Sequence, residues 1–168
     1  FNIARLIPGK AEFNETLRYF KDRLQRAGVR IVLGQRATAD ELIAGGFAHV
    51  LLATGIRPRT PQIYGVDHPK VLSYLDVLKH GASVGSDVAI IGAGGIGFDV
   101  AEFLTAHETD PAADIAAFCQ QWGIDRNLAT PGALLPDGPV FGKPKRRISL
   151  LQRTKGKVGA RLAKTTGW

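Results

Sequence analysis

The chain has 168 residues, of which 45% are hydrophobic and 22% charged, and a formal net charge of +7 at neutral pH. This composition indicates a folded domain and excludes a disordered chain, and no apolar run approaches the roughly 20 residues of a membrane-spanning helix, so we expect no membrane partner. The single cysteine, Cys119, excludes a disulfide framework and a multi-cysteine metal site, and it favours a cytoplasmic location.

The first third of the chain alternates between helical and strand-like patterns. Residues 12–28 form a predicted amphipathic helix that ends at Gly28, a common C-cap residue. We predict short buried strands at 29–33 and 48–55, with a helical turn at 38–42 between them. Helices and strands in this alternation are typical of an α/β layer.

Residues 56–69 separate this part of the chain from the next. They contain three prolines and a glycine, which interrupt helices and sheets, so we predict a crossing segment or linker. A short helix is predicted at 73–81, with Ser73 as its N-cap and Asp76 three residues later in the manner of a capping box. A new unit is therefore expected to begin after the linker.

The most specific motif is VAIIGAGGIGFD, at residues 88–99. Four apolar residues predict a strand, a Gly-x-Gly-x-x-Gly loop follows, and the next residues predict an amphipathic helix. In this context the loop is typical of a dinucleotide site, because a phosphate lies against the N–H groups and the partial positive charge of the helix start. The alternative is a glycine-rich turn that binds nothing. The predicted cofactor-binding residues of the motif are Gly92, Ala93, Gly94, Gly95, Ile96 and Gly97.

Each glycine of the motif has its own predicted role. We expect Gly92 to form the tight turn and Gly94 to let the pyrophosphate approach the backbone without a Cβ in the way. Gly97 is expected to let the helix pack closely against the strand.

A long insertion is predicted at residues 108–145. Asp110 and Pro111 suit the N-cap and first position of a helix that runs to about Trp122. Glycines and prolines then indicate an irregular excursion of about 20 residues. The next strand is predicted at 148–151.

The end of that strand bears on which dinucleotide binds. NAD sites place an acidic residue there, which accepts hydrogen bonds from the ribose. Asp110 and Asp114 have nearly the usual spacing from the glycine loop, but they belong to the predicted helix, and strand 148–151 has no acidic residue after it. Positive charge at this place suits the 2′-phosphate of NADPH, and a solvated basic loop is the alternative. The basic residues in question are Arg153, Lys155 and Lys157.

Six segments carry a resemblance to a known family: AHVLLATGIRPRTP, HPKVLSYLDVL, VAIIGAGGIGFDVAEFL, IAAFCQQWGID, LLQRTKGKVG and KTTGW. They are similar to the C-terminal half of bacterial NADPH-dependent 2,4-dienoyl-CoA reductases, iron–sulfur flavoproteins related to old yellow enzyme. The similarity runs over essentially the whole chain, including the long insertion. Relatives of similar layout act on other enones or on amines.

The resemblance implies an electron relay. In that family an N-terminal barrel with FMN reduces the enoyl-CoA substrate in a step of fatty acid β-oxidation. A 4Fe–4S cluster carries electrons to the barrel, and a C-terminal module supplies them by passing hydride from NADPH to FAD. That module is a Rossmann-like, three-layer α/β fold of the glutathione-reductase type with two dinucleotide sites, and the resemblance implies that this chain holds it incompletely.

The resemblance also implies a division of the chain. Residues 1–80 would belong to the FAD-binding subdomain, and residues 81–168 to the NADPH-binding subdomain with its insertion. Thr54 and Gly55 would lie near the FAD, which would have only a partial site here. The segment with Arg153 and the nearby lysines would receive the 2′-phosphate.

The sequence departs from the family in what it lacks. It has no barrel, no cysteine cluster and no second glycine motif for FAD, it starts at Phe1, and it contains no methionine. We therefore expect a piece of a longer polypeptide, whose partner is the remainder of its own chain and which has no reductase activity alone. FMN, the iron–sulfur cluster and the enoyl-CoA substrate are expected only in the longer protein. No catalytic acid or base and no metal ligand is assigned.

Two other functions stay open. Residues 143–164 contain nine of the 22 Lys and Arg and no acidic residue, so this end of the chain could bind nucleic acid through phosphate contacts. The same stretch has no aromatic residue on which bases could stack, and we expect no nucleic-acid partner. The glycine loop could also bind NAD in a regulatory role without redox chemistry.

Overall fold

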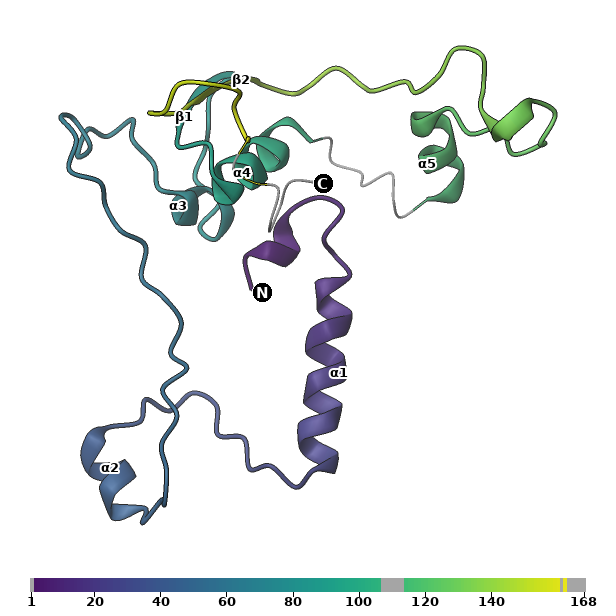
Figure 1. Ribbon diagram of the computed structural model, residues 1–168. Coiled ribbons are helices and arrows are strands. Elements are labelled where there is room, and N and C mark those ends of the chain that lie inside the picture. Colours follow the sequence, from purple (N-terminus) through teal and green to yellow (C-terminus); the bar gives the residue numbers. More distant parts are fainter. Residues whose placement is uncertain (1, 107–113, 161, 163–168) are drawn as a thin grey trace. The chain divides into compact units, whose positions relative to one another are not determined.

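The computed structural model describes residues 2–106, 114–160 and 162 (Figure 1). The chain divides into two compact units: the first contains Phe1–Leu17 and Leu72–Trp168, and the second contains Arg18–Val71. In chain order the elements are η1 (Ala4–Leu6), α1 (Phe13–Arg26), α2 (Ala39–Ala44), α3 (Tyr74–Leu78), β1 (Asp87–Ile91), α4 (Gly95–Thr105), α5 (Ile115–Trp122), η3 (Pro131–Ala133) and β2 (Arg147–Leu151). None of the helices in the described ranges has the length and apolar character to span a membrane.

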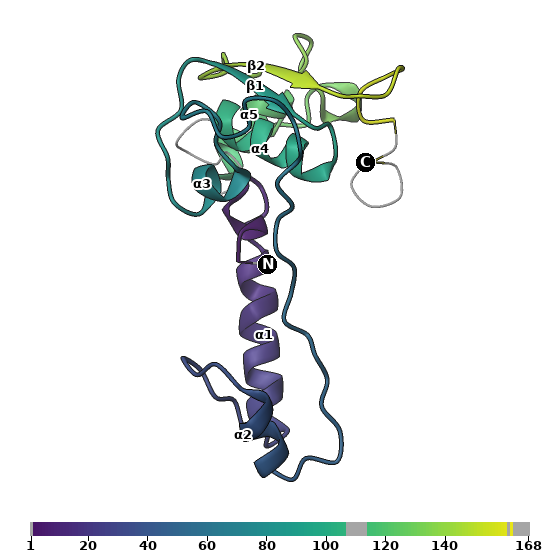
Figure 2. The ribbon, with the colours of Figure 1, turned by 90° about the vertical axis from the view of Figure 1, so that its left-hand side faces the viewer.

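The first unit is built on two parallel strands. β1 and β2 pair with Val88 opposite Ile148 and Ile90 opposite Leu150, and α4 follows β1 directly. Exposure alternates along both strands, so that one face of the pair is covered and the other is open. Figure 2 shows α3 and α4 on the same side of the strands. The predicted strand, glycine loop, helix and second strand are therefore confirmed.

A small apolar core lies under this strand pair. Its buried side chains are Ile7, Val77, Leu78, Val100 and Leu104, with Val88, Ile90 and Ile148 of the strands packed against them. The N-terminal segment belongs to this core, because Ile7 is only 2% exposed and Lys10 Nζ lies 2.5 Å from Asp99 Oδ1 on α4. The first residues of the chain therefore pack with the glycine-loop helix.

The helix α3 begins as its sequence predicts. The Ser73 hydroxyl accepts a hydrogen bond from the Asp76 backbone N–H, and the Asp76 carboxylate accepts one from the Ser73 N–H. The Ser73 hydroxyl also donates to the Asp76 carboxylate over 2.7 Å, and this bond, together with that from the Ser73 N–H, holds the pKa of Asp76 below its usual range. The capping box starts a five-residue helix that supplies Val77 and Leu78 to the core.

The second unit corrects part of the sequence interpretation. The helical turn predicted at 38–42 is present as α2, with a capping box between Thr38 and Glu41 that lowers the pKa of Glu41. The strands predicted at 29–33 and 48–55 are wrong: neither segment pairs with another strand within the described residues. Their apolar side chains stay in solvent, and Leu51 is 94% exposed. An extended segment becomes a strand only when a neighbour completes its hydrogen bonds.

The segment from Asp114 to residue 145 is mostly irregular, as predicted. The start predicted for its helix at Asp110 and Pro111 lies outside the described residues, but Asp114 is extended, with a φ of −126°, so the helix that reaches Trp122 begins later than predicted. Within them, α5 begins at Ile115, where the Asp114 carboxylate accepts a hydrogen bond from the Ala117 N–H, and it ends before Gly123, whose φ is 65°. The predicted end near Trp122 is confirmed.

A buried carboxylate organises the turn after α5. Asp125 is 6% exposed and accepts hydrogen bonds from the backbone N–H groups of Asn127, Ala129 and Thr130 and from the Thr130 hydroxyl. These donors, with the Asn127 N–H first, hold the pKa of Asp125 below its ordinary value. The insertion thus has local order although it contains little regular structure.

Candidate cofactor-binding site

The glycine loop connects the end of β1 to the start of α4. Gly92 has a φ of 120°, a conformation that favours glycine, and its N–H donates to the Leu151 carbonyl at the end of β2 over 2.8 Å. Gly94 is the N-cap of α4 and has no side chain that could satisfy the N–H groups of the first turn. The arrangement therefore presents a helix start at the carboxyl edge of the two strands, where α/β folds bind nucleotides.

The space around Gly94 and Gly97 differs sharply. A Cβ built on Gly94 would meet nothing within 4 Å, so the loop backbone is open to a ligand at this point. A Cβ built on Gly97 would lie 1.9 Å from the Gly92 carbonyl oxygen. Gly97 therefore permits a contact between α4 and the loop that any other residue would force apart.

A cavity of about 280 Å³ lies between the glycine loop and the chain that follows β2. Its lining residues come from these two segments only: Gly92, Ala93, Gln152, Arg153, Thr154, Lys155, Gly156, Lys157, Gly159 and Ala160. The structure thus brings Gly92 and Ala93, the first residues of the glycine motif, together with all three predicted basic residues, although Ala93 and Arg153 are 60 positions apart in the chain. Gly94, Gly95, Ile96 and Gly97 form the adjoining cap and first turn of α4 and do not line this cavity.

The charge of this cavity suits an anion. Arg153, Lys155 and Lys157 are exposed, and the lining contains no acidic residue. A phosphate that lies between these cations and the helix start would be attracted by both. The residues present therefore fit a phosphorylated dinucleotide.

The sequence interpretation missed Gln152 as a lining residue. Its side-chain Nε2 donates to the Thr154 carbonyl over 2.9 Å and to the Gly156 carbonyl over 3.0 Å. The sequence does show a polar residue directly after the strand. It does not show the two hydrogen bonds of the Gln152 side chain, because these depend on how the loop folds.

Thr54 and Gly55, the residues predicted to lie near FAD, belong to the second unit. Both are exposed in a segment that is neither helix nor strand, and Gly55 has a φ of 78°. Their part in an FAD site stays a prediction.

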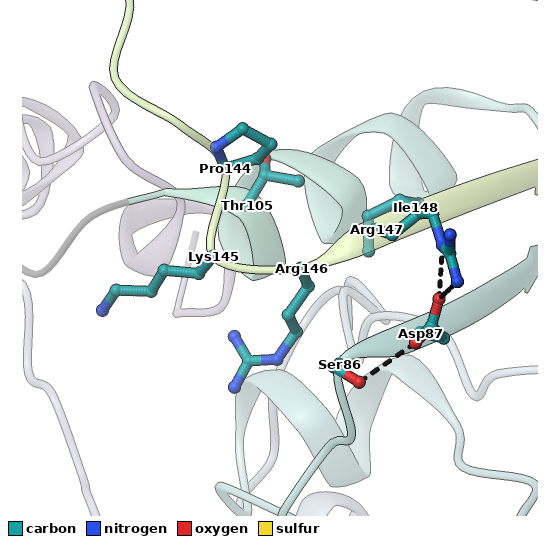
Figure 3. A pocket seen from close by; sticks show the side chains of 8 residues that line it. All are labelled: Ser86, Asp87, Thr105, Pro144, Lys145, Arg146, Arg147 and Ile148. Carbon is teal, nitrogen blue, oxygen red and sulfur yellow. Dashed lines mark hydrogen bonds and ion pairs between the residues drawn. The ribbon is translucent and has the colours of Figure 1, made fainter.

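A second hollow, of about 680 Å³, lies at the opposite ends of β1 and β2 (Figure 3). Its basic residues already have protein partners: Arg147 pairs with Asp87, and Arg146 Nη1 donates to the Leu104 carbonyl at the end of α4 over 3.0 Å. These contacts hold the sheet edge and the helix end together. The hollow therefore has a structural role, and the cavity beside the glycine loop is the candidate site.

Metal binding finds no support within the described ranges, since no three His, Cys, Asp or Glu side chains gather there in a group that could hold an ion. The chemistry of the candidate site rests on backbone N–H groups and basic side chains alone.

Comparisons with known proteins agree with this geometry. Residues 23–116 match the family model described as pyridine nucleotide-disulphide oxidoreductase, and this stretch includes the glycine loop and α4. The structure of a 2-naphthoyl-CoA reductase in complex with 2-naphthoyl-CoA superimposes with a TM-score of 0.54 over 88% of this chain and 26% of that one, at 21% identity. That likeness concerns the fold, and it supports the predicted Rossmann-like α/β class, which is confirmed.

Several curated relatives are reductases or oxidases. Bilirubin reductase of Mediterraneibacter gnavus is 34% identical over 103 residues, which are 61% of this chain and 16% of that protein. NADH oxidase of Thermoanaerobacter brockii is 36% identical over 106 residues, 61% of this chain and 16% of that protein. Cinnamate reductase of Clostridium sporogenes is 36% identical over 104 residues, 59% of this chain and 15% of that protein.

The aligned part of the chain thus spans about a sixth of the length of these relatives. The family match covers more than half of the chain and contains the glycine loop that the structure places at the cavity. The matched family implies binding of FAD and of NAD(P)H. This chain belongs to the pyridine nucleotide-disulphide oxidoreductase family.

Proposed function

We propose that the chain is the NADPH-binding, electron-input part of a flavin-dependent reductase of the 2,4-dienoyl-CoA reductase type. The observation that carries this proposal is the cavity in which the glycine loop faces Arg153, Lys155 and Lys157. The N–H groups at the start of α4 would bind the pyrophosphate of the nucleotide. The three cations, in a lining without an acidic residue, would bind the additional 2′-phosphate on the ribose.

The proposed roles follow from the placement of each group. Gly92, Ala93 and the first turn of α4 would hold the pyrophosphate, while the basic loop after β2 would hold the 2′-phosphate. Bound NADPH supplies a hydride for FAD, and the chain itself only binds and orients the nucleotide. Residues 1–80 would contribute part of the FAD-binding subdomain and residues 81–168 the beginning of the NADPH-binding subdomain.

We further propose that the partner of this chain is the rest of a longer polypeptide. That part would carry FMN, a 4Fe–4S cluster and the site for an enoyl-CoA substrate. The resemblance to dienoyl-CoA reductases supports the substrate class, and the similarity to a cinnamate reductase and to a bilirubin reductase supports a reductase. Another enone or an amine is the alternative substrate.

The direct test is a titration of the 168-residue chain with NADPH and with NADH by calorimetry. We expect NADPH to bind more tightly, with a preference that weakens as salt is added, because the difference between the two cofactors is one exposed phosphate. Equal affinity for both cofactors would contradict the assignment of NADPH. NADH is included in the comparison because one relative is an NADH oxidase. A parallel titration with short duplex DNA tests the alternative, and salt-sensitive binding of DNA alone would favour it.

A further inference from the structure

Gln152 lies directly after β2, and its side chain forms hydrogen bonds with the backbone of the loop that follows. Its carboxamide nitrogen has two hydrogens, and the structure uses both: one bond goes to the Thr154 carbonyl at 2.9 Å and the other to the Gly156 carbonyl at 3.0 Å. Gly156 has a φ of 112°, so the turn that brings its carbonyl to Gln152 requires a glycine. Arg153 and Lys155 alternate with the bonded residues, and their side chains are exposed.

The far end of the loop is held as well. Gly159 lies against Phe98 of α4, so closely that a Cβ built on it would come within 3.0 Å of the Phe98 Cζ. The Leu162 N–H donates to the Gly159 carbonyl over 2.9 Å. The stretch with the three cations is therefore fixed between the Gln152 side chain and the helix that starts at the glycine loop.

We propose that Gln152 is a positioning residue that determines preference for a nucleotide with a 2′-phosphate, an inference that rests on the proposed function. Gln152 folds the loop so that Arg153, Lys155 and Lys157 face the cavity, and it does so with a neutral group. A carboxylate at the same place has no hydrogen to donate to the two carbonyls, and it would add negative charge beside the phosphate. One amide thus orders the basic loop and keeps it free of an opposing charge.

The test compares Gln152→Leu, which keeps the size and removes the donors, with Gln152→Glu, which keeps the shape and reverses the hydrogen-bonding character. Gln120→Leu on the exposed surface of α5 is the matched control. The affinities of the 168-residue chain for adenosine 2′,5′-bisphosphate and for adenosine 5′-monophosphate are measured by calorimetry. Hydrogen–deuterium exchange of residues 153–160 is measured without any ligand.

We expect Gln152→Leu to lower the affinity for the bisphosphate roughly tenfold, the effect of losing two ordinary hydrogen bonds, and to leave the monophosphate unchanged. Gln152→Glu should lower it further. Both variants should speed exchange in the loop, while Gln120→Leu changes neither measurement. A general loss of structure would instead weaken both nucleotides equally, and that result would overturn the positioning role.

The two proposals fail in different ways. A wild-type chain that does not prefer the bisphosphate overturns the proposed function, and with it the selectivity assigned to Gln152. A wild-type chain that prefers the bisphosphate, together with a Gln152→Leu variant that keeps both this preference and slow exchange, overturns only the inference about Gln152.

Discussion

Arg153 is the first basic residue after β2, and its guanidinium is exposed at the cavity beside the glycine loop. Arg153→Ala should weaken NADPH about tenfold and leave NADH nearly unchanged, because only NADPH has a 2′-phosphate to pair with the guanidinium. Calorimetric titration of both cofactors measures the difference. Arg59→Ala, an exposed arginine of the second unit, is the control and should change neither affinity. Equal losses for both cofactors in Arg153→Ala would count against this role.

Substitution by alanine should affect stability at Gly97 but not at Gly94. Gly97→Ala brings a Cβ to 1.9 Å from the Gly92 carbonyl oxygen, so the loop and α4 must move apart, and we expect a loss of about 1–3 kcal/mol in the free energy of unfolding. Gly94→Ala meets nothing within 4 Å, so the fold should survive while the approach of a pyrophosphate is blocked.

Thermal unfolding followed by circular dichroism, together with NADPH titration, separates these two effects. Gly97→Ala should lose both stability and binding, and Gly94→Ala should lose only binding. If Gly94→Ala bound NADPH as well as the wild type, the pyrophosphate would not lie over Gly94.

The lowered pKa of Asp125 predicts that the stability of the turn after α5 depends on pH. Its folded pKa is lowered, chiefly by the Asn127 N–H, relative to the ordinary aspartate value of 3.8. The ionised carboxylate therefore stabilises the turn above pH 3.8, and this contribution is lost as the pH falls through the lowered value. The protection of the amides at 127, 129 and 130 against hydrogen exchange, measured relative to their intrinsic exchange rates at each pH, should fall in that acidic range.

Asp125→Asn removes the titrating group and is the natural comparison. It should have faster exchange at neutral pH, because the amide NH2 faces backbone donors, and it should lack the acidic transition. An unchanged acidic transition in this variant would assign the effect to another carboxylate.

Among the elements, α3 and α2 share one capping device but differ in what they bury. α3 contributes Val77 and Leu78 to the core, whereas α2 buries no residue. Ser73→Ala should therefore lower the global stability by about 1 kcal/mol, and Thr38→Ala should fray α2 with little change in the main unfolding transition. Urea unfolding of both variants, followed by circular dichroism, measures this contrast. Similar shifts of the midpoint would show that α2 has tertiary contacts in solution.

Local sequence patterns predicted some of the helices and strands correctly and others wrongly. The periodicity of 12–28, the capping box at Ser73 and the apolar run before Gly92 each predicted an element that is present, because caps and periodicity are satisfied within one element. The strands predicted from the apolar runs at 29–33 and 48–55 are absent, since a strand depends on a partner strand that can come from any part of the sequence.

The candidate site was predictable to a similar degree. The glycine loop and the basic residues after strand 148–151 were both identified, and because parallel strands end at the same edge, they meet at one cavity. Gln152 was missed because its two bonds depend on the fold of the loop. The pairing of Arg147 with Asp87 was missed for the same kind of reason, since it depends on the register of β1 against β2.

At the scale of the whole molecule, the basic end of the chain has two separate uses. Arg146 and Arg147 hold the sheet and the end of α4 together, while Arg153, Lys155 and Lys157 line the cavity at the opposite edge. Five of the nine basic residues in 143–164 are thus divided between structural contacts and a candidate anion site. We expect this division to suit a compact phosphorylated ligand better than a long polyanion.

Catalysis by the 168-residue chain alone is not expected. The matched part of the chain corresponds to about a sixth of the length of its curated relatives. In the proposed function, FAD accepts the hydride, and the substrate would be reduced at an FMN barrel in the rest of a longer polypeptide. We therefore expect the 168-residue chain to bind NADPH without oxidising it when a 2,4-dienoyl-CoA is added, as followed by NADPH absorbance. A longer polypeptide that includes an FMN barrel and carries Arg153→Ala should reduce the substrate with a raised KM for NADPH and a similar kcat, since Arg153 binds the cofactor and takes no part in hydride transfer. Steady oxidation of NADPH by the 168-residue chain would show that the reducing chemistry lies in these residues and would overturn the electron-input role.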